Sequence, residues 1–192
     1  VWSFSRLNSF YNCPYEFYLH YIECNHSEGG FFSEYGSLMH SILEKYEKGE
    51  LSLFELNQYY EDHFNEAIPH DAPPNKYVDI RQSYFDKGMD YLNNIDLDLE
   101  QQYEVLGVEK KVDFELFGKK FVGFIDLLVR DKTSEELIII DHKSASIKIL
   151  KNGNISKSDQ QHFLEFKRQL YLYSIPIIKE YGPVSKLKWN MF

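Results

Sequence analysis

The spacing of apolar residues changes along the chain and predicts a helical first half followed by a region richer in strands. From about residue 33 to 97, apolar side chains recur as on one face of a helix, and a segment with three prolines, 69–75, interrupts this pattern. Residues 3–22 also predict a helix, and a polar turn is expected at 23–30. The region before residue 100 is therefore expected to be mainly helical.

Three strands are predicted between residues 103 and 143. Val112, Phe114 and Leu116 alternate with acidic residues, and Gly118 marks a hairpin turn to a second apolar strand at 121–129. The third strand, 137–143, opens with four apolar residues and is expected to be buried on both faces. A polar connection at 144–160, a helix at about 158–181 and a last strand at 186–192 follow. The pattern predicts one compact domain over residues 1–192 that contains both helices and strands.

The end of the third predicted strand carries the candidate chemistry. Asp141 and Lys143 are two positions apart and share a face, while His142 points away from them. Asp126 lies inside the second apolar strand, where a carboxylate is costly to bury unless it is paired or binds a metal. An anionic metal ligand beside a cation suits metal-assisted attack of water on a phosphodiester.

Further polar residues fit the same chemistry. His40 lies near the start of an amphipathic helix, and Gln169 and Tyr173, four apart, share one face of the last predicted helix. Each has a structural alternative: His40 could sit at the edge of an apolar stripe, Lys143 could be an exposed strand-end lysine, and Gln169 and Tyr173 could pack against their neighbours.

The order of these elements resembles the PD-(D/E)XK nuclease superfamily, and within it the RecB-like, CRISPR-associated exonuclease-like branch. The matching motifs are Gly36-x-x-x-His40, Gly123-x-x-Asp126, Asp141-x-Lys143 and Gln169-x-x-x-Tyr173, and residues 3–21 look like the family's N-terminal helix. The resemblance covers the chain from near residue 3 to its end. It implies an α/β fold with a restriction-endonuclease-like core, in which helices flank a central mixed β-sheet. The helical N-terminal part would cover about 1–100, and the catalytic sheet and C-terminal helix about 101–192.

The resemblance also implies roles for individual residues. Asp126, Asp141 and Lys143 would be catalytic. His40, Asp126, Asp141 and the backbone carbonyl of His142 would bind Mg²⁺ or Mn²⁺, hard cations that suit oxygen ligands. Glu109 stands where several relatives keep an acid, but we do not count it among the expected ligands.

Substrate binding is expected from both the last helix and the loop before it. Gln169 and Tyr173 would orient the DNA or the region of Lys143, and Lys148 and Lys151, with Lys157, would contact phosphates. The expected activity is that of a metal-dependent DNA nuclease, an exonuclease acting on single strands or duplex ends in recombination, repair or phage DNA processing.

The formal net charge of −9 is the main argument against a nucleic-acid enzyme, since such proteins usually show a basic footprint. We therefore expect weak, salt-sensitive DNA binding, with a protein partner in a recombination or repair complex supplying the rest. Two alternatives stay open: a catalytically inactive nuclease fold that serves as a DNA-binding or scaffold module, and an unrelated interaction protein. A metal titration separates them from the nuclease.

Cysteine usage and hydropathy indicate an intracellular, cytoplasmic setting, which includes a phage-encoded protein. Cys13 and Cys24 form no disulfide framework and are too few for an iron–sulfur cluster, which needs four thiolates. No apolar stretch approaches the roughly 20 residues of a membrane span, so no membrane partner is expected. The chain does not begin with methionine and ends within a predicted strand, so we expect it to be a trimmed piece of a longer sequence.

Overall fold

A computed structural model describes residues 1–25, 29–95 and 99–192 of the chain. The elements in chain order are α1 (Phe4–Asn12), α2 (Pro14–Tyr21), α3 (Phe31–Glu47), α4 (Leu56–Ala67), α5 (Ile80–Asn93), α6 (Leu99–Gln102), β1 (Tyr103–Leu116), β2 (Lys119–Asp131), β3 (Leu137–Lys143), α7 (Gln160–Tyr181) and β4 (Lys186–Met191). Residues 26–28 of the expected polar turn and 96–97 of the expected helical region lie outside the described residues. Within the described ranges, no helix combines the length and apolarity needed to cross a bilayer.

The four strands form one mixed sheet in the order β1-β2-β3-β4, which confirms the predicted sheet. β1 pairs with β2 and β2 pairs with β3 in antiparallel fashion, and the turn between β1 and β2 falls at Phe117 and Gly118, as expected. β3 and β4 run parallel. Parallel neighbours need a crossover connection, and α7 supplies it.

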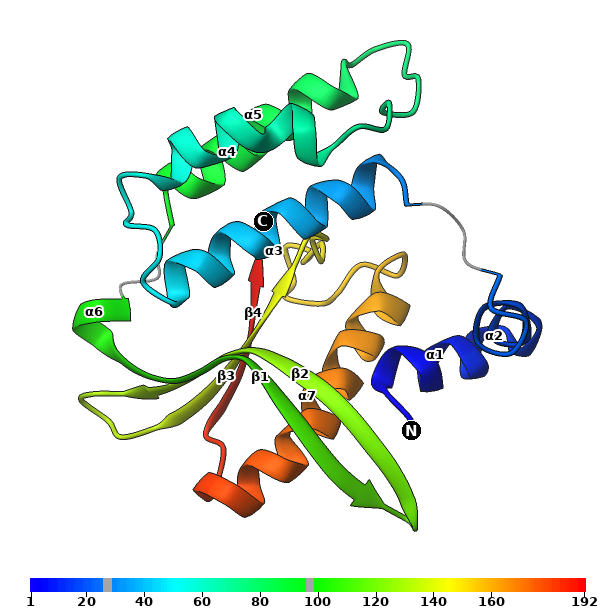
Figure 1. Cartoon of the computed structure of the whole chain (residues 1–192), viewed down its shortest axis with the longest axis vertical. Helices are drawn as coiled ribbons and strands as arrows, with labels where there is room; N and C mark the ends of the chain where they lie inside the picture. The colour runs from blue at the N-terminus through cyan, green and yellow to red at the C-terminus, as the bar shows by residue number, and fades with distance from the viewer. Residues whose placement is uncertain (26–28, 96–98) are drawn as a thin grey trace.

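Helices cover both faces of the sheet (Figure 1). α7 packs on one face, where Leu170 and Ile177 meet apolar residues of all three longer strands. α3 crosses the other face, where its Tyr46 packs against the apolar cluster that includes Ile138 and Ile140 of β3. α4 and α5 form an additional layer on the outer side of α3. The two faces of β3 therefore belong to two different apolar cores, which explains its continuous run of apolar residues.

The N-terminal segment forms two helices, so the prediction of one helix over residues 3–22 was wrong. Cys13 is extended, with φ of −150°, and separates α1 from α2. Pro14 follows as the first residue of α2, where its missing N–H has no intrahelical partner to lose. The Cys13 sulfur accepts a hydrogen bond from the backbone amide of Glu16 at 3.4 Å. Cys13 thus acts as the N-cap of α2.

Tyr173 of α7 joins the N-terminal helix to the sheet. Its hydroxyl accepts a hydrogen bond from the backbone amide of Phe4 at 3.2 Å. Its ring lies against Gly123 of β2, where a Cβ atom would be only 2.4 Å from Cε1 of Tyr173. The glycine of the Gly123-x-x-Asp126 motif is therefore required by the close approach of α7 to the strand that carries Asp126.

We expect Gly123→Ala to destabilise the protein by about 1–3 kcal/mol, because the added methyl group would overpack the contact with Tyr173. The free energy of unfolding in urea measures this effect. Gly30→Ala is the matched control, since its backbone is extended and a Cβ atom there would meet nothing within 4 Å. Equal stabilities of the Gly123→Ala variant and the unmodified protein would contradict the steric argument.

Candidate metal centre

The candidate site forms where β1 and β2 both interrupt their regular alternation of faces. Ile125 and Leu127 are two residues apart, yet Ile125 packs in the core beneath α7 and Leu127 packs in the core beneath α3. Asp126 is the residue between them. On β1, Val108 also packs on the α3 side, whereas Lys110 reaches the hydroxyl of Tyr181 on α7 at 3.0 Å. Residues two apart on a regular strand share a face, so each strand is irregular at this point.

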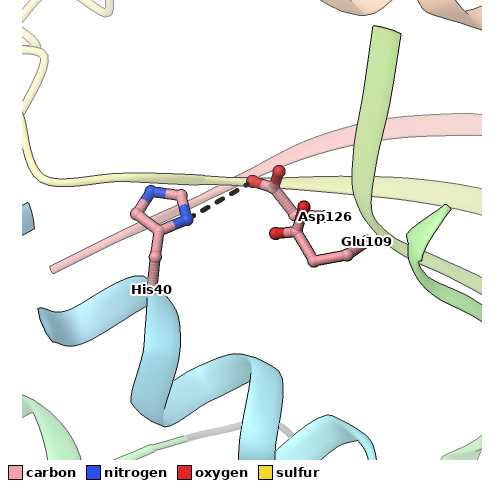
Figure 2. Close-up of side chains that lie close together, drawn as sticks. All are labelled: His40, Glu109 and Asp126. Atoms are coloured by element: carbon pink, nitrogen blue, oxygen red, sulfur yellow. Dashed lines mark ion pairs between the residues drawn. The ribbon is translucent and has the colours of Figure 1, made fainter. Parts of the chain in front are cut away.

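Glu109 occupies the irregular position of β1 and lies opposite Asp126. The neighbouring pairs are Val108 with Leu127 and Lys110 with Ile125, which brackets Glu109 and Asp126 in the register. Glu109 has φ of 47°, in the left-handed region that residues with a side chain seldom adopt. Such a conformation costs about 1–3 kcal/mol and persists only where the surrounding structure enforces it. The strained backbone directs the Glu109 carboxylate toward that of Asp126 (Figure 2).

Three side chains from three elements converge at this place (Figure 2). His40 from α3, Glu109 from β1 and Asp126 from β2 each offer one ligand atom, and these atoms all lie within 4.8 Å of one another. Nδ1 of His40 is 3.9 Å from Oδ2 of Asp126. Within the residues that the structure describes, no other group of three or more His, Cys, Asp or Glu side chains brings its ligand atoms this close together.

The electrostatics of the group favour a bound cation. Burial lowers the pKa of His40, which leaves its ring neutral and able to act as a ligand. Burial raises the pKa of Glu109, and the nearby charge of Asp126 raises it further. Carboxylates held this close repel each other, and a divalent cation between them offsets that repulsion. The donor set of one imidazole and two carboxylates therefore fits a hard divalent cation such as Mg²⁺ or Mn²⁺.

Asp141 and Lys143 lie together at the end of β3, which confirms that they share a face. The Lys143 ammonium donates hydrogen bonds to Oδ1 of Asp141 and to Oε1 of Gln169, both at 3.0 Å, and lies 5.1 Å from the centre of the Phe166 ring. Burial raises the pKa of Asp141 to about 6, against the opposing effect of Lys143. Oδ2 of Asp141 lies 2.8 Å from the lysine nitrogen, so the ammonium contacts both oxygens of the buried carboxylate. Asp141 is not part of the group formed by His40, Glu109 and Asp126.

His142 links this strand end to Asp126 through its backbone. Its amide donates a hydrogen bond to Oδ2 of Asp126 at 2.6 Å. Its side chain points away to the α3 face, as expected, and Nε2 lies 2.6 Å from Oε1 of Glu47. Burial opposes a charge on the ring, but the hydrogen bond and charge of Glu47, together with the charges of Asp126 and Asp141, raise the pKa of His142.

Two acids of this region were not among the expected site residues. Glu109 could not be found from the alternation of β1, because its left-handed backbone breaks that alternation. Glu47 is buried beside His142, and burial raises its pKa. The sequence does carry a signal for Glu47: it falls four residues after Leu43 and eight after Met39, so a charge stands on the apolar stripe of α3. An acid on such a stripe needs a buried partner, and His142 is that partner.

The remaining predicted site residues lie on α7 and in the loop that precedes it. Gln169 is tied to Lys143, and it lines a hollow of about 410 Å³ that reaches Asp126 and Phe166. Tyr173 also lines this hollow but is mostly buried against Gly123. Lys148 and Lys151 are exposed in the loop between β3 and α7, where Ile149 and Ile155 form an isolated antiparallel bridge.

The glycine of the other helical motif also has a steric explanation. Gly36 lies one turn before His40 on α3, and a Cβ atom there would be 3.1 Å from Oγ of Ser144, the residue after Lys143. The absence of a side chain lets α3 approach the end of β3 closely. This approach brings His40 to the strands that carry Asp126 and Asp141.

Comparison with known proteins gives two findings. A sequence profile of the PD-(D/E)XK nuclease superfamily matches residues 1–190. Among solved structures, the chain is similar to the crystal structure of a candidate exonuclease from Eubacterium rectale, with a TM-score of 0.52 and 14% sequence identity. This similarity covers 98% of the chain but 65% of the other protein, and at such identity it concerns the fold. No curated protein matches the chain significantly.

Proposed function

The chain belongs to the PD-(D/E)XK nuclease superfamily, and from this premise we propose that it hydrolyses phosphodiester bonds of DNA with the help of a divalent cation. One observation carries the proposal: His40, Glu109 and Asp126 offer ligand atoms that all lie within 4.8 Å of one another. The strained backbone of Glu109 supports it further, since strain of this kind clusters at functional sites.

His40 and Asp126 would hold the cation, which is Mg²⁺ or Mn²⁺, with Glu109 as a third side chain. We propose Asp141 and the carbonyl of His142 as additional ligands, because both residues lie beside Asp126: the His142 amide donates a hydrogen bond to Asp126, and the charge of Asp126 adds to burial in raising the pKa of Asp141. A divalent cation in such a site polarises the phosphoryl group and lowers the pKa of bound water. The single imidazole favours Mn²⁺ somewhat over Mg²⁺.

Lys143 would stabilise the charge that develops on the phosphate. Asp141 and Gln169 hold its ammonium by hydrogen bonds, and the Phe166 ring lies beside it, so its position is set before substrate binds. A preorganised cation lowers the energy of a charged transition state more than a mobile one does. Asp141 thereby has a second role, which is to position Lys143.

The substrate that we propose is a DNA single strand or duplex end, and the activity is that of an exonuclease in recombination, repair or phage DNA processing. The resemblance to the RecB-like branch and the name of the E. rectale protein support this assignment. The net charge of −9 indicates that DNA is held weakly, with a protein partner contributing to its capture.

A nuclease assay tests the proposal directly. Linear and circular DNA, each single- and double-stranded, are incubated with Mg²⁺ or Mn²⁺ and, as a control, with EDTA. We expect cleavage of linear DNA with either cation and none with EDTA, and an Asp126→Asn variant excludes a contaminating nuclease. If no DNA is cleaved with either cation, the chain is a catalytically inactive module with a nuclease fold.

The lysines of the loop between β3 and α7 give a separate prediction. Replacing Lys148, Lys151 and Lys157 with glutamine should weaken DNA binding and reduce the slope of log affinity against log salt by about 2–3, because fewer counterions are released. Fluorescence anisotropy at several salt concentrations measures the slope.

The matched control replaces three exposed lysines outside this loop in the same way, and it should leave the slope unchanged. These are Lys76, Lys119 and Lys120. An equal slope in the loop variant and the control variant would mean that the loop does not contact phosphates.

A further inference from the structure

An apolar groove of about 770 Å³ lies between α7 and the N-terminal helices. Phe4, Leu7 and Tyr11 line one side of it, and Arg168, Tyr171 and Leu172 line the other. Several of these side chains are exposed despite their size, with Tyr11 at 71% and Tyr171 at 54% relative exposure. Aromatic side chains exposed on both sides of a groove indicate a binding surface.

Cations lie directly on these aromatic rings. The Arg168 guanidinium is 5.5 Å from the ring centre of Tyr11, across the groove, and the Lys167 ammonium is 5.6 Å from the ring centre of Tyr171. Arg168 is the one charged residue among the described residues that line the groove. In a chain with a net charge of −9, this apolar surface therefore carries positive charge at its edge. Aromatic faces combined with arginine are what single-stranded nucleic acids bind, by base stacking and phosphate pairing.

The groove adjoins the hollow at the candidate metal centre. Phe4 and Asn8 of α1 line both, so the two share a wall. α7 also lines both, with different residues on two adjacent sides of the helix. Arg168 and Tyr171 face the groove, whereas Phe166 and Gln169 face the hollow that reaches Asp126.

We propose that this groove binds the single-stranded part of a nucleic acid next to the phosphate that is cleaved. Bases stack on Tyr11 and Tyr171, and Arg168 pairs with a phosphate at the groove. The inference rests on the proposed function for the meaning of the adjacent metal centre, and it names the form of the substrate: a strand whose bases are unpaired on the α1 side of the site.

Binding is tested without cleavage, by anisotropy of a fluorescent oligothymidylate of about 20 nucleotides in EDTA. Tyr11→Ala and Tyr171→Ala should each lower the affinity about 5- to 100-fold, as loss of a stacking platform does. Arg168→Gln should reduce the salt slope by about 0.7, the value for one phosphate contact on a single strand. Tyr77→Ala is the matched control, because Tyr77 is 92% exposed in the connection between α4 and α5, and it should bind as the unmodified protein does.

Two outcomes would overturn the inference. Tyr11→Ala and Tyr171→Ala variants that melt normally and bind the oligonucleotide as the control does would show that no bases stack in the groove. A dimer in sedimentation that Tyr11→Ala converts to monomers would assign the groove to a second copy of the chain.

The proposed function and the proposed role of the groove can be refuted independently. If the unmodified protein binds the oligonucleotide through the groove but cleaves no DNA with Mg²⁺ or Mn²⁺, the proposed nuclease activity is refuted and the proposed binding in the groove is not. A protein that cleaves DNA while its groove variants bind normally would refute only the groove.

Discussion

An Asp126→Asn variant is expected to lose divalent-cation binding and DNA cleavage together while it stays folded. The carboxylate would bind the cation beside His40 and Glu109, and removing a ligand that helps to stabilise the transition state by several kcal/mol should slow cleavage by about 10³-fold or more. The amide oxygen of asparagine can still accept the hydrogen bond that the His142 amide donates to position 126. Isothermal titration with Mn²⁺ and single-turnover cleavage measure the two effects.

The stability of the Asp126→Asn variant is informative in the metal-free protein. Because Asp126 raises the pKa of Glu109, the two carboxylates repel each other, and neutralising one should leave the melting temperature in EDTA equal or higher. Asp113→Asn is the matched control, since Asp113 is an exposed acid on β1. It should bind Mn²⁺ and cleave DNA normally. Undiminished Mn²⁺ affinity in the Asp126→Asn variant would refute the assignment of Asp126 as a ligand.

Replacing Lys143 should separate catalysis from binding. A lysine ammonium would compete with a metal ion, so Lys143→Ala should keep or slightly strengthen the affinity for Mn²⁺. Cleavage should nevertheless fall by about 10²-fold or more, because a preorganised cation that stabilises developing charge is lost. Lys143 lowers the pKa of Asp141, so its removal should raise that pKa further. The measurements should therefore be made at about pH 8, where Asp141 stays ionised in the variant.

A second lysine–aspartate pair on a strand provides the control for this experiment. Lys111 and Asp113 are also two residues apart on a strand, with Nζ and Oδ2 at 3.0 Å, but their side chains are 58% and 65% exposed. Lys111→Ala should change neither metal affinity nor cleavage. If Lys143→Ala cleaved DNA as fast as Lys111→Ala, the catalytic role of Lys143 would be wrong, and a catalytically inactive module would explain the chain better.

Much of the fold follows from local patterns in the sequence. The continuous apolar run of β3 predicted burial on both faces, and the cores under α3 and α7 meet there as expected. The spacing of Asp141 and Lys143 predicted that they share a face, and in the structure they form an ion pair. The break between α1 and α2 was missed although Pro14, which can begin a helix but not continue one, marked it.

The candidate metal centre could be predicted only in part. His40 and Asp126 were named from their motifs, but Glu109 enters the group through a left-handed backbone that no alternation of residues reveals. The packing of the whole sheet determines that conformation, since β1 must keep its register with β2 while both change faces. Local sequence patterns do not predict where a residue lies when its position depends on such long-range packing.

The parallel pairing of β3 with β4 has a consequence for the nascent chain. Asp141 and Lys143 pair with Trp189 and Met191, and the amide of Phe192 donates a hydrogen bond to the Lys143 carbonyl. Until these late residues emerge from the ribosome, the strand that carries Asp141 and Lys143 has an open edge. Since domains fold during synthesis from the N-terminal side, β3 gains its second neighbouring strand only when translation has passed α7. A chain that stops before β4 therefore lacks one of the two neighbours of the strand that carries Asp141 and Lys143.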